Sequence, residues 1–329
     1  MNRTVRMAAW SVWTVCALSA CSHDGAEPVD EGSGASSLCI ETGCNDIAAV
    51  ATVPDAENLL FTPDGRLFVS GGTNVFEAVR TDETVVELTA LSASDCNFTG
   101  LAHHADVLYA SCGSGELFAG RLTATPELTP IYQYLDTALP NGMAMGADGS
   151  LYVVDGPLPG NGGLPSPKII RLRFAADDPF QVVEQVTWLQ APLAFPNGLV
   201  RLESQLFVTD ASVVPPALGL VRAVQIEADG SAGAVATIAT LAGVPDDLAL
   251  AGQDLIVTEY STGRVVRIAL DGTQISATNP GGYSFPSSVI VGRSPMFAPD
   301  EWLVTEKGQI GDTSSSVGNR LTLMRPQQP

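Results

Sequence analysis

Six positions recur along the chain and carry side chains that could bind a metal ion. Successive members of the set are 41 to 56 residues apart: Glu57, Thr99, Asn141, Asn197, Asp246 and Ser287. The Glu, the Asp and the two Asn residues present carboxylate or amide oxygens, which are the ligands that hard divalent cations such as Ca²⁺ prefer. The set therefore predicts a cation site, if the fold brings these positions together.

Turn formation is the alternative explanation for three of these positions. The sequences PNG at 140–142 and 196–198 and PDD at 245–247 are good turn sequences whatever their chemistry. Glu57 has no turn preference, yet it falls at the same place in its repeat. This favours metal binding over the turn interpretation.

Each of the six positions belongs to a unit of short apolar runs. The clearest run is the second of each unit: 67–70, 108–111, 151–155, 206–210, 255–259 and 302–305. A shorter apolar segment that turns through Asp-Gly or a similar polar corner precedes each of them, which is typical of a β-hairpin. A third run follows in every unit and a fourth in most. Four strands per unit of about 40 to 50 residues predict an all-β fold, a six-bladed β-propeller over residues 46–329.

The last unit lacks an obvious fourth strand because the chain ends soon after the run LTLMR. Residues Asp46 to Pro54 resemble the fourth-strand stretch AVATIATLAGVP of an earlier unit. We therefore predict that this N-terminal strand completes the sixth blade. The ring would then be closed, with no free sheet edge between its first and last blades.

The propeller fold would place the six recurring positions around one axis, because the first strand of each blade lines the central channel. Glu57, Asn141, Asn197 and Asp246 would converge there with a combined charge of −2, which suits one Ca²⁺ ion with water at the remaining positions. Two long insertions, Gly156–Pro167 and Ala211–Gly219, both follow a second strand. They should emerge on one face, which is a common place for a binding surface.

The N-terminus has the pattern of an export signal. Arg3 and Arg6 precede an apolar run that is short for a membrane span, and the run ends in the sequence LSAC. This end resembles the lipobox of bacterial lipoproteins, in which the signal is removed and the cysteine, here Cys21, receives lipid. We expect a signal peptide at 1–20, a flexible lipid-anchored tether at 21–45, and a location in the cell envelope, on the periplasmic face or the outer membrane. An ordinary signal peptide with an incidental cysteine is the alternative, and a single membrane anchor is a weaker one.

Four further cysteines would remain in the exported chain: Cys39, Cys44, Cys96 and Cys112. An even number suggests two disulfides, with three connectivities. A hairpin turning near residue 105 brings positions around 99 and 112 opposite each other, so we favour Cys96 with Cys112 and Cys39 with Cys44. Metal binding by these cysteines lacks a Cys-x-x-Cys pair and a nearby His.

Charge and motifs exclude several classes of function. The formal net charge is −20 and no basic stripe occurs, so nucleic acid is not an expected partner. The Gly-x-Ser-x-Gly, His-Glu-x-x-His and Walker motifs are absent from the sequence, which leaves serine hydrolases, zinc proteases and nucleotide binding without support.

The four oxygen-bearing residues on a six-bladed repeat resemble a known superfamily. It contains gluconolactonase, senescence marker protein (regucalcin) and luciferin-regenerating enzyme, with paraoxonase and diisopropylfluorophosphatase as more distant relatives. In that superfamily a Glu, two Asn and an Asp bind a catalytic divalent cation, usually Ca²⁺. The resemblance implies metal-dependent hydrolysis of a small-molecule lactone or related ester, with Asp246 as ligand and as base or nucleophile. Asp247 would be a reserve base, but as the next residue of a strand it should point the other way.

Two departures from the superfamily pattern bear on the substrate. Gluconolactonase-like members carry an Arg where this chain has Leu139, so a more apolar substrate than a sugar lactone is expected. Paraoxonase-like members carry a His where Thr99 stands. His103 and His104 follow on the same strand, where a structural or solvated His is favoured over a catalytic one. The accessory candidates for the site are Thr99, His103, His104, Asp247 and Ser287. The alternative function is a non-catalytic propeller lipoprotein that binds a ligand or protein partner, with at most a structural metal; chemistry like that of strictosidine synthase is a weaker option.

Overall fold

The computed structural model describes residues 39–41, 43–92, 94–156, 166–212, 218–310 and 312–327. All of these residues belong to one compact unit within 31–329. The expected signal peptide and Cys21 lie outside the described residues, as do most of the two insertions. Within the described ranges no helix is long and apolar enough to cross a membrane.

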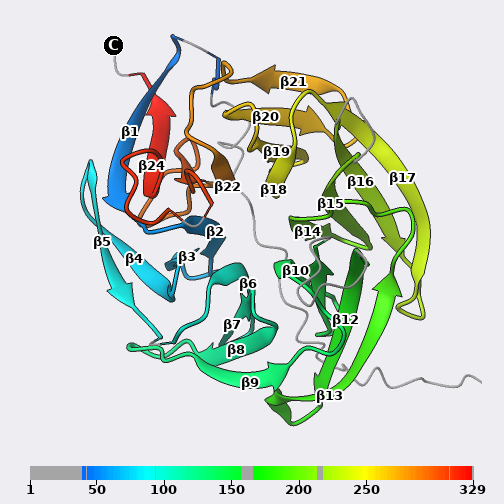
Figure 1. Ribbon diagram of the computed structural model, residues 1–329. Coiled ribbons are helices and arrows are strands. Elements are labelled where there is room, and N and C mark those ends of the chain that lie inside the picture. The colour runs from blue at the N-terminus through cyan, green and yellow to red at the C-terminus, as the bar shows by residue number, and fades with distance from the viewer. Residues whose placement is uncertain are drawn as a thin grey trace, which may run out of the picture. The chain divides into compact units, whose positions relative to one another are not determined.

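Every regular element of the described residues is a β-strand, and the strands form six antiparallel sheets of four (Figure 1). Blades one to three are β2 (Ala56–Phe61), β3 (Leu67–Gly71), β4 (Asn74–Asp82) and β5 (Val85–Ala90); β6 (Phe98–His104), β7 (Val107–Cys112), β8 (Glu116–Arg121) and β9 (Thr129–Gln133); β10 (Pro140–Met145), β11 (Leu151–Asp155), β12 (Lys168–Ala175) and β13 (Asp178–Leu189). Blades four and five are β14 (Leu199–Leu202), β15 (Gln205–Ala211), β16 (Gly219–Ile226) and β17 (Ala232–Leu241); β18 (Pro245–Ala251), β19 (Asp254–Glu259), β20 (Arg264–Ala269) and β21 (Gln274–Ala277). Blade six is β22 (Pro286–Val291), β23 (Trp302–Glu306), β24 (Arg320–Pro326) and β1 (Asn45–Thr52). The predicted six-bladed propeller is confirmed.

The sixth blade is closed by the two ends of the folded body. β1 pairs antiparallel with β24, with Asp46 opposite Arg325 and Ala48 opposite Leu323. Figure 1 shows the blue β1 beside the red β24. This confirms the predicted closure of the ring.

The folded body begins earlier than expected. Ile40 lies within the segment assigned to the tether, but only 1% of its surface is exposed and it belongs to the apolar cluster that contains Trp302 and Met324. The disulfide between Cys39 and Cys44 lies beside it, just before β1. The described body therefore includes residues from 39 onwards, which the expected boundaries placed in the tether at 21–45.

Apolar side chains pack between adjacent blades. The second strands β3, β7, β11 and β23 are buried along their whole length, because a neighbouring blade covers each face. The outermost strands, such as β5 and β13, alternate or are largely exposed. One cluster joins Phe61 and Leu67 of blade one to Leu303 and Leu323 of blade six. Sheets packed face to face in this way make the ring rigid and fix the first strands around the axis.

A register break occurs near the start of the first strand in five blades. The breaks lie between Ala56 and Leu59, Phe98 and Leu101, Pro140 and Met143, Pro245 and Leu248, and Pro286 and Ser288. Each recurring position lies inside its break, so it is part of a β-bulge, where two residues face one on the partner strand. In blade four, Asn197 and Gly198 directly precede β14. The strict alternation of side chains between two faces does not hold at these positions.

Removal of the closing strand tests the contribution of β1 to stability. Deleting Asp46–Val53 removes the β1–β24 ladder and the buried Val50 and Val53. Burial of two valines contributes roughly 3 to 6 kcal/mol, which corresponds to a fall in Tm of about 10 °C for a domain of this size. Thermal melts followed by circular dichroism measure it, with deletion of Ser22–Leu38 as the control that should leave Tm unchanged. An unaltered Tm after the first deletion would contradict the role of β1.

Candidate functional site

The structure brings the four predicted ligands together at the axis. Glu57, Asn141, Asn197 and Asp246 come from four blades and line one narrow axial cavity, together with Ser287, Asn58, Asp247 and two glycines. Glu57 and Asp246 are 6% and 7% exposed. A larger hollow of about 850 Å³ lies away from the axis, beside β5, β8 and β9, and none of the predicted metal-binding or catalytic residues lines it.

Three of the accessory candidates are not placed for chemistry in this cavity. Thr99 is buried, but its Oγ1 donates to the backbone oxygen of Pro140 at 2.8 Å. His103 and His104 lie at the far end of β6, four and five residues beyond Thr99, which is roughly 13 to 17 Å along a strand. Burial, followed by the charges of Arg293 and His104, lowers the pKa of His103. Neither histidine lines the axial cavity.

Ser287 lines the cavity, but its hydroxyl serves the backbone. Its Oγ donates to the backbone oxygen of Ala56 at 2.8 Å, which joins blade six to blade one. A structural role accounts for this residue.

The expectation that Asp247 points away from the axis is wrong. Asp247 lines the same cavity as Asp246 because the bulge places both side chains on the axial side. Its Oδ2 accepts hydrogen bonds from Asn58 Nδ2 at 2.7 Å and from Ser288 Oγ at 2.6 Å. A carboxylate of blade five is therefore held by blades six and one.

Three glycines allow blades two to four to pack closely against the blades that follow them at the axis. Gly100, Gly142 and Gly198 follow the recurring positions of blades two to four. A Cβ atom would lie 2.1 Å from Asn141 O at Gly100 and 2.5 Å from Asn197 O at Gly142. The main-chain N–H groups of Gly142 and Gly198 donate to the oxygens of Asn197 and Asp246, each at 3.0 Å. Any larger residue would push the blades apart at the axis.

Hydroxyl groups of the second strands carry the same contacts around the ring. Thr305 Oγ1 donates to Glu57 O at 2.8 Å and accepts from Ser288 N at 2.8 Å. Thr209 Oγ1 likewise donates to Asp246 O at 2.5 Å and accepts from Gly198 N at 2.7 Å. The backbone of each metal-ligand candidate in blades one and five is thus fixed by the preceding blade.

A carboxylate at the end of the second strand clamps the segment before the first strand in four blades. These clamps are Asp155, Asp210, Glu259 and Glu306. Asp210 Oδ1, for example, accepts from the N–H groups of Ala194 and Phe195 at 3.1 and 2.6 Å, and its Oδ2 lies 2.6 Å from Arg222 Nε. The first clamped residue lies three positions before the recurring position in each case: Ala138, Ala194, Gly243 and Ser284.

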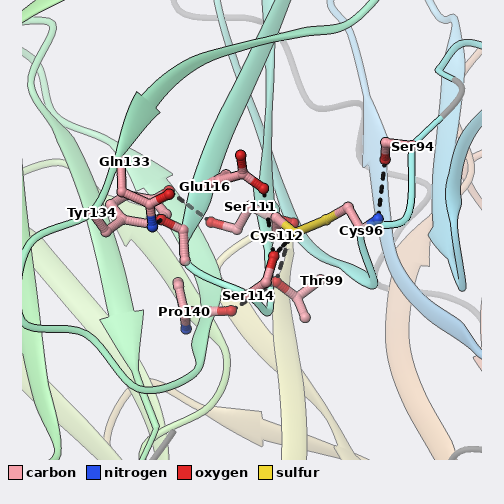
Figure 2. Close-up of a disulfide and its surroundings, with 11 residues drawn as sticks. Ser94, Cys96, Thr99, Ser111, Cys112, Ser114, Glu116, Gln133, Tyr134 and Pro140 are labelled. Carbon is pink, nitrogen blue, oxygen red and sulfur yellow. Dashed lines mark hydrogen bonds between the residues drawn. A yellow bond between two sulfur atoms is a disulfide. The ribbon is translucent and has the colours of Figure 1, made fainter. Parts of the chain in front are cut away.

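Blade two uses a disulfide for the same purpose. Cys112 occupies the place of the clamping carboxylate, and it is bonded to Cys96, three positions before Thr99 (Figure 2). The structure thus contains both disulfides favoured from the sequence. The covalent bond ties the same two segments that an acid and backbone N–H groups tie elsewhere.

Lys307 belongs to the site, although sequence reasoning missed it. It directly follows β23, and its Nζ lies 2.5 Å from Glu57 Oε2 and 3.1 Å from Asp55 Oδ1. The residue is only 7% exposed. A lone lysine after a strand has no motif to mark it. The signal that the sequence offered was its position at the end of the second strand of blade six, the blade next to Glu57 in the closed ring.

The cavity holds more acidic than basic groups. Burial, followed by the charge of Glu57, raises the pKa of Asp246 well above its usual value, against the charge of Lys307. Burial also raises the pKa of Asp247 to about 7, although hydrogen bonds from Ser288 and Asn58 oppose this. For Lys307, burial disfavours the charge, but Glu57 and Asp55 outweigh it and raise the pKa.

This donor set fits a hard divalent cation. Three carboxylates, Glu57, Asp246 and Asp247, share the buried site with one ammonium group. Asn141 Nδ2 lies 3.3 Å from Glu57 Oε1, and Asn197 donates to Asp246. Turning either amide by 180° would present its oxygen to an ion instead. Because the described residues hold no metal-binding group of three His, Cys, Asp or Glu, a cation here would depend on these amide oxygens.

Comparison with known proteins supports the fold. No protein-family model and no curated protein matches the chain. Among solved structures, a gluconolactonase from Xanthomonas campestris is similar with a TM-score of 0.64 at 18% identity, over 88% of this chain and 92% of that one. A luciferin-regenerating enzyme is similar with a TM-score of 0.62 at 14% identity, over 85% of this chain and 95% of that one. A calcium-binding regucalcin from Agrobacterium tumefaciens is similar with a TM-score of 0.61 at 14% identity, over 87% of this chain and 95% of that one. These likenesses confirm, at the level of the fold, the resemblance found in the sequence.

The raised pKa of Asp247 predicts a pH-dependent stability. The folded value of about 7 exceeds the unfolded value of about 3.9, so the folded state holds its proton more tightly. Its stabilising effect is full below pH 4 and is lost as the pH rises through 7, by at most about 4 kcal/mol. In chelator, the Tm of Asp247→Asn should therefore exceed that of the wild type by more at pH 8 than at pH 5.

Thermal melts between pH 5 and 8.5 measure this difference. Asp229→Asn is the control, because Asp229 is an exposed carboxylate whose pKa is lowered by its bonds with Ser231. An equal loss of Tm in the Asp247→Asn variant and the wild type would show that Asp247 is not held protonated.

Proposed function

We propose that the protein hydrolyses lactones or related esters with the help of a divalent cation, Ca²⁺ or another hard ion. The proposal is carried by the convergence of Glu57, Asn141, Asn197 and Asp246 in one buried cavity with an excess of carboxylates. The similar fold of a gluconolactonase supports a small-molecule substrate. Glu57, Asn141, Asn197 and Asp246 would hold the ion, which when bound would polarise the substrate carbonyl.

The chain's own carboxylates would handle the proton. Asp246 is the proposed base or nucleophile, and Asp247 is a second base in the same cavity. A water oxygen forms a bond to the carbonyl carbon while a carboxylate takes its proton; the ester C–O bond then breaks, and the leaving oxygen receives a proton to give the hydroxy acid. Asn58 and Ser288 hold Asp247 for this step, and its pKa of about 7 suits proton uptake near neutral pH.

The residues before the ligands favour an apolar substrate. Two positions before each recurring residue, blades three to six carry Leu139, Phe195, Val244 and Phe285, all partly exposed. The rings of Tyr260 and Phe285 lie 5.1 Å apart. Burial, followed by the charge of Asp246, raises the pKa of Tyr260 to about 12, and its OH donates to the oxygen of Gly308, the residue after Lys307, so this pair lies close to the site. An apolar ring portion or acyl chain would find matching contacts here, whereas a sugar would find few charged partners.

We also propose that the protein works at the cell envelope, held by a lipid on Cys21. The charged and apolar pattern of residues 1–20 and the sequence LSAC support this. A soluble form beginning at Ser22 is therefore suitable for enzymology.

Turnover and metal content test the function together. The chain from Ser22 is expected to bind one Ca²⁺ ion and to hydrolyse apolar lactones or aryl esters better than gluconolactone, with activity lost in chelator. Asp246→Asn should lower kcat/KM at least about 100-fold. Mass spectrometry of bound metal and a panel of substrates give the readouts.

Two results would count against the proposal. Bound calcium without turnover would indicate a structural ion and the non-catalytic, ligand- or partner-binding alternative. Absence of any bound metal, with turnover insensitive to chelator, would remove the cation from the account.

A further inference from the structure

Glu57, the ligand candidate of blade one, is already paired with a cation of the chain itself. Lys307 Nζ lies 2.5 Å from Glu57 Oε2, and both residues are buried. We propose that Lys307 is a built-in cation that holds Glu57 in position and weakens the binding of a divalent cation, so that the site binds its ion with reduced affinity. The inference rests on the proposed cation site.

The backbone holds Lys307 in this place. Its N–H donates to Phe285 O at 3.1 Å, and the next N–H, of Gly308, donates to Ser284 O at 3.3 Å. Gly308 O accepts from Tyr260 OH at 2.8 Å. A Cβ at Gly308 would lie 2.1 Å from Val317 O. With main-chain and neighbouring groups fixed on both sides, the short reach from Lys307 to Glu57 does not depend on a mobile loop.

The fold does not require a charge at this position. Lys307 directly follows Glu306, the clamping carboxylate at the end of the second strand of blade six. The residue at the same place in each of the other five blades is uncharged: Gly72, Gly113, Gly156, Ala211 and Tyr260. Among the described residues, only blade six directs an ammonium group from this position to a metal-ligand candidate, Glu57. Lys307 is therefore a feature of the site and not of the blade repeat.

Charge opposes simultaneous binding of Lys307 and a metal ion. Both would lie against the same carboxylate of Glu57, and like charges repel strongly where burial limits screening by water. Lys307 also neutralises part of the acidic charge that attracts an ion, since Asp55 Oδ1 is 3.1 Å from its Nζ. Replacing Lys307 with a neutral side chain removes the repulsion and leaves both acids without their partner.

Calcium affinity measured by titration calorimetry tests this inference. In the chain from Ser22, Lys307→Met should bind Ca²⁺ at least about tenfold more tightly than the wild type. In chelator it should be less stable than the wild type, and Ca²⁺ should raise its Tm by more. Lys307→Gln repeats the test with a neutral side chain that can still donate to Glu57. Lys307→Arg keeps the charge and should keep the wild-type affinity within a few fold.

Lys168→Met is the matched control. Lys168 is a buried lysine of blade three that pairs with Asp136 and Asp155 and, unlike Lys307, with none of the metal-ligand candidates. Its loss should lower Tm and leave Ca²⁺ affinity unchanged. Folded Lys307→Met and Lys307→Gln variants whose Ca²⁺ affinity equals or falls below that of the wild type would overturn the inference.

The two proposals fail separately. If only the neutral Lys307 variants bind Ca²⁺, the role of Lys307 is supported and a cation-dependent activity of the wild type is not. If the wild type binds Ca²⁺ and hydrolyses esters but the neutral variants gain no affinity, the proposed function stands and the role of Lys307 is lost.

Discussion

The close approach of the six first strands at the axis is the constraint on which the site depends. In blades one and five a bulge turns two successive residues towards the axis, Glu57 with Asn58 and Asp246 with Asp247, and the neighbouring blade fixes the backbone there. Thr305 and Thr209 bond the carbonyls of Glu57 and Asp246, while Gly142 and Gly198 donate directly across the blade boundary. The same contacts that hold the ring together therefore position the polar side chains. A site built on rigid strands in this way is preorganised for a ligand.

A second set of contacts fixes the entrance to each first strand. Asp155, Asp210, Glu259 and Glu306 use buried carboxylates for this, each satisfied by at least one backbone N–H group and a basic side chain. Blade two replaces the carboxylate with the Cys96–Cys112 disulfide. The exchange is understandable because both devices join the end of the second strand to the residue three positions before the recurring one. The five blades therefore connect the same two segments, four with a carboxylate and one with a disulfide.

The repeat made most of the fold predictable. Alternating apolar runs and their spacing predicted six blades, and the resemblance of 46–54 to a fourth strand predicted the closure by β1. The fourth strand of blade five, β21, was not recognised because Gln274–Ala277 is short and lacks an apolar run. The sequence around Ile40 is polar enough to resemble a tether, and its burial depends on contacts with residues far along the chain, such as Trp302.

The polar site was predictable only in part. The alignment of the repeats was enough to predict that Glu57, Asn141, Asn197 and Asp246 converge at one place. Asp247 was misplaced because strand alternation was assumed, and a bulge cannot be read from a single sequence. Lys307 lies 250 residues from Glu57, and no local pattern links a lysine after one strand to a glutamate at the start of another. Its effect on the charge of the cavity emerges only from the closed ring.

The central claim is that a divalent cation binds on the propeller axis. Crystals of the chain from Ser22 grown with Mn²⁺, which scatters anomalously and accepts the same oxygen ligands, would show its position directly. The account predicts one anomalous peak at coordination distance, roughly 2.0 to 2.6 Å, from oxygens of Glu57, Asn141, Asn197 and Asp246. Peaks confined to surface carboxylates, with Lys307 still bound to Glu57 and no ion on the axis, would contradict it.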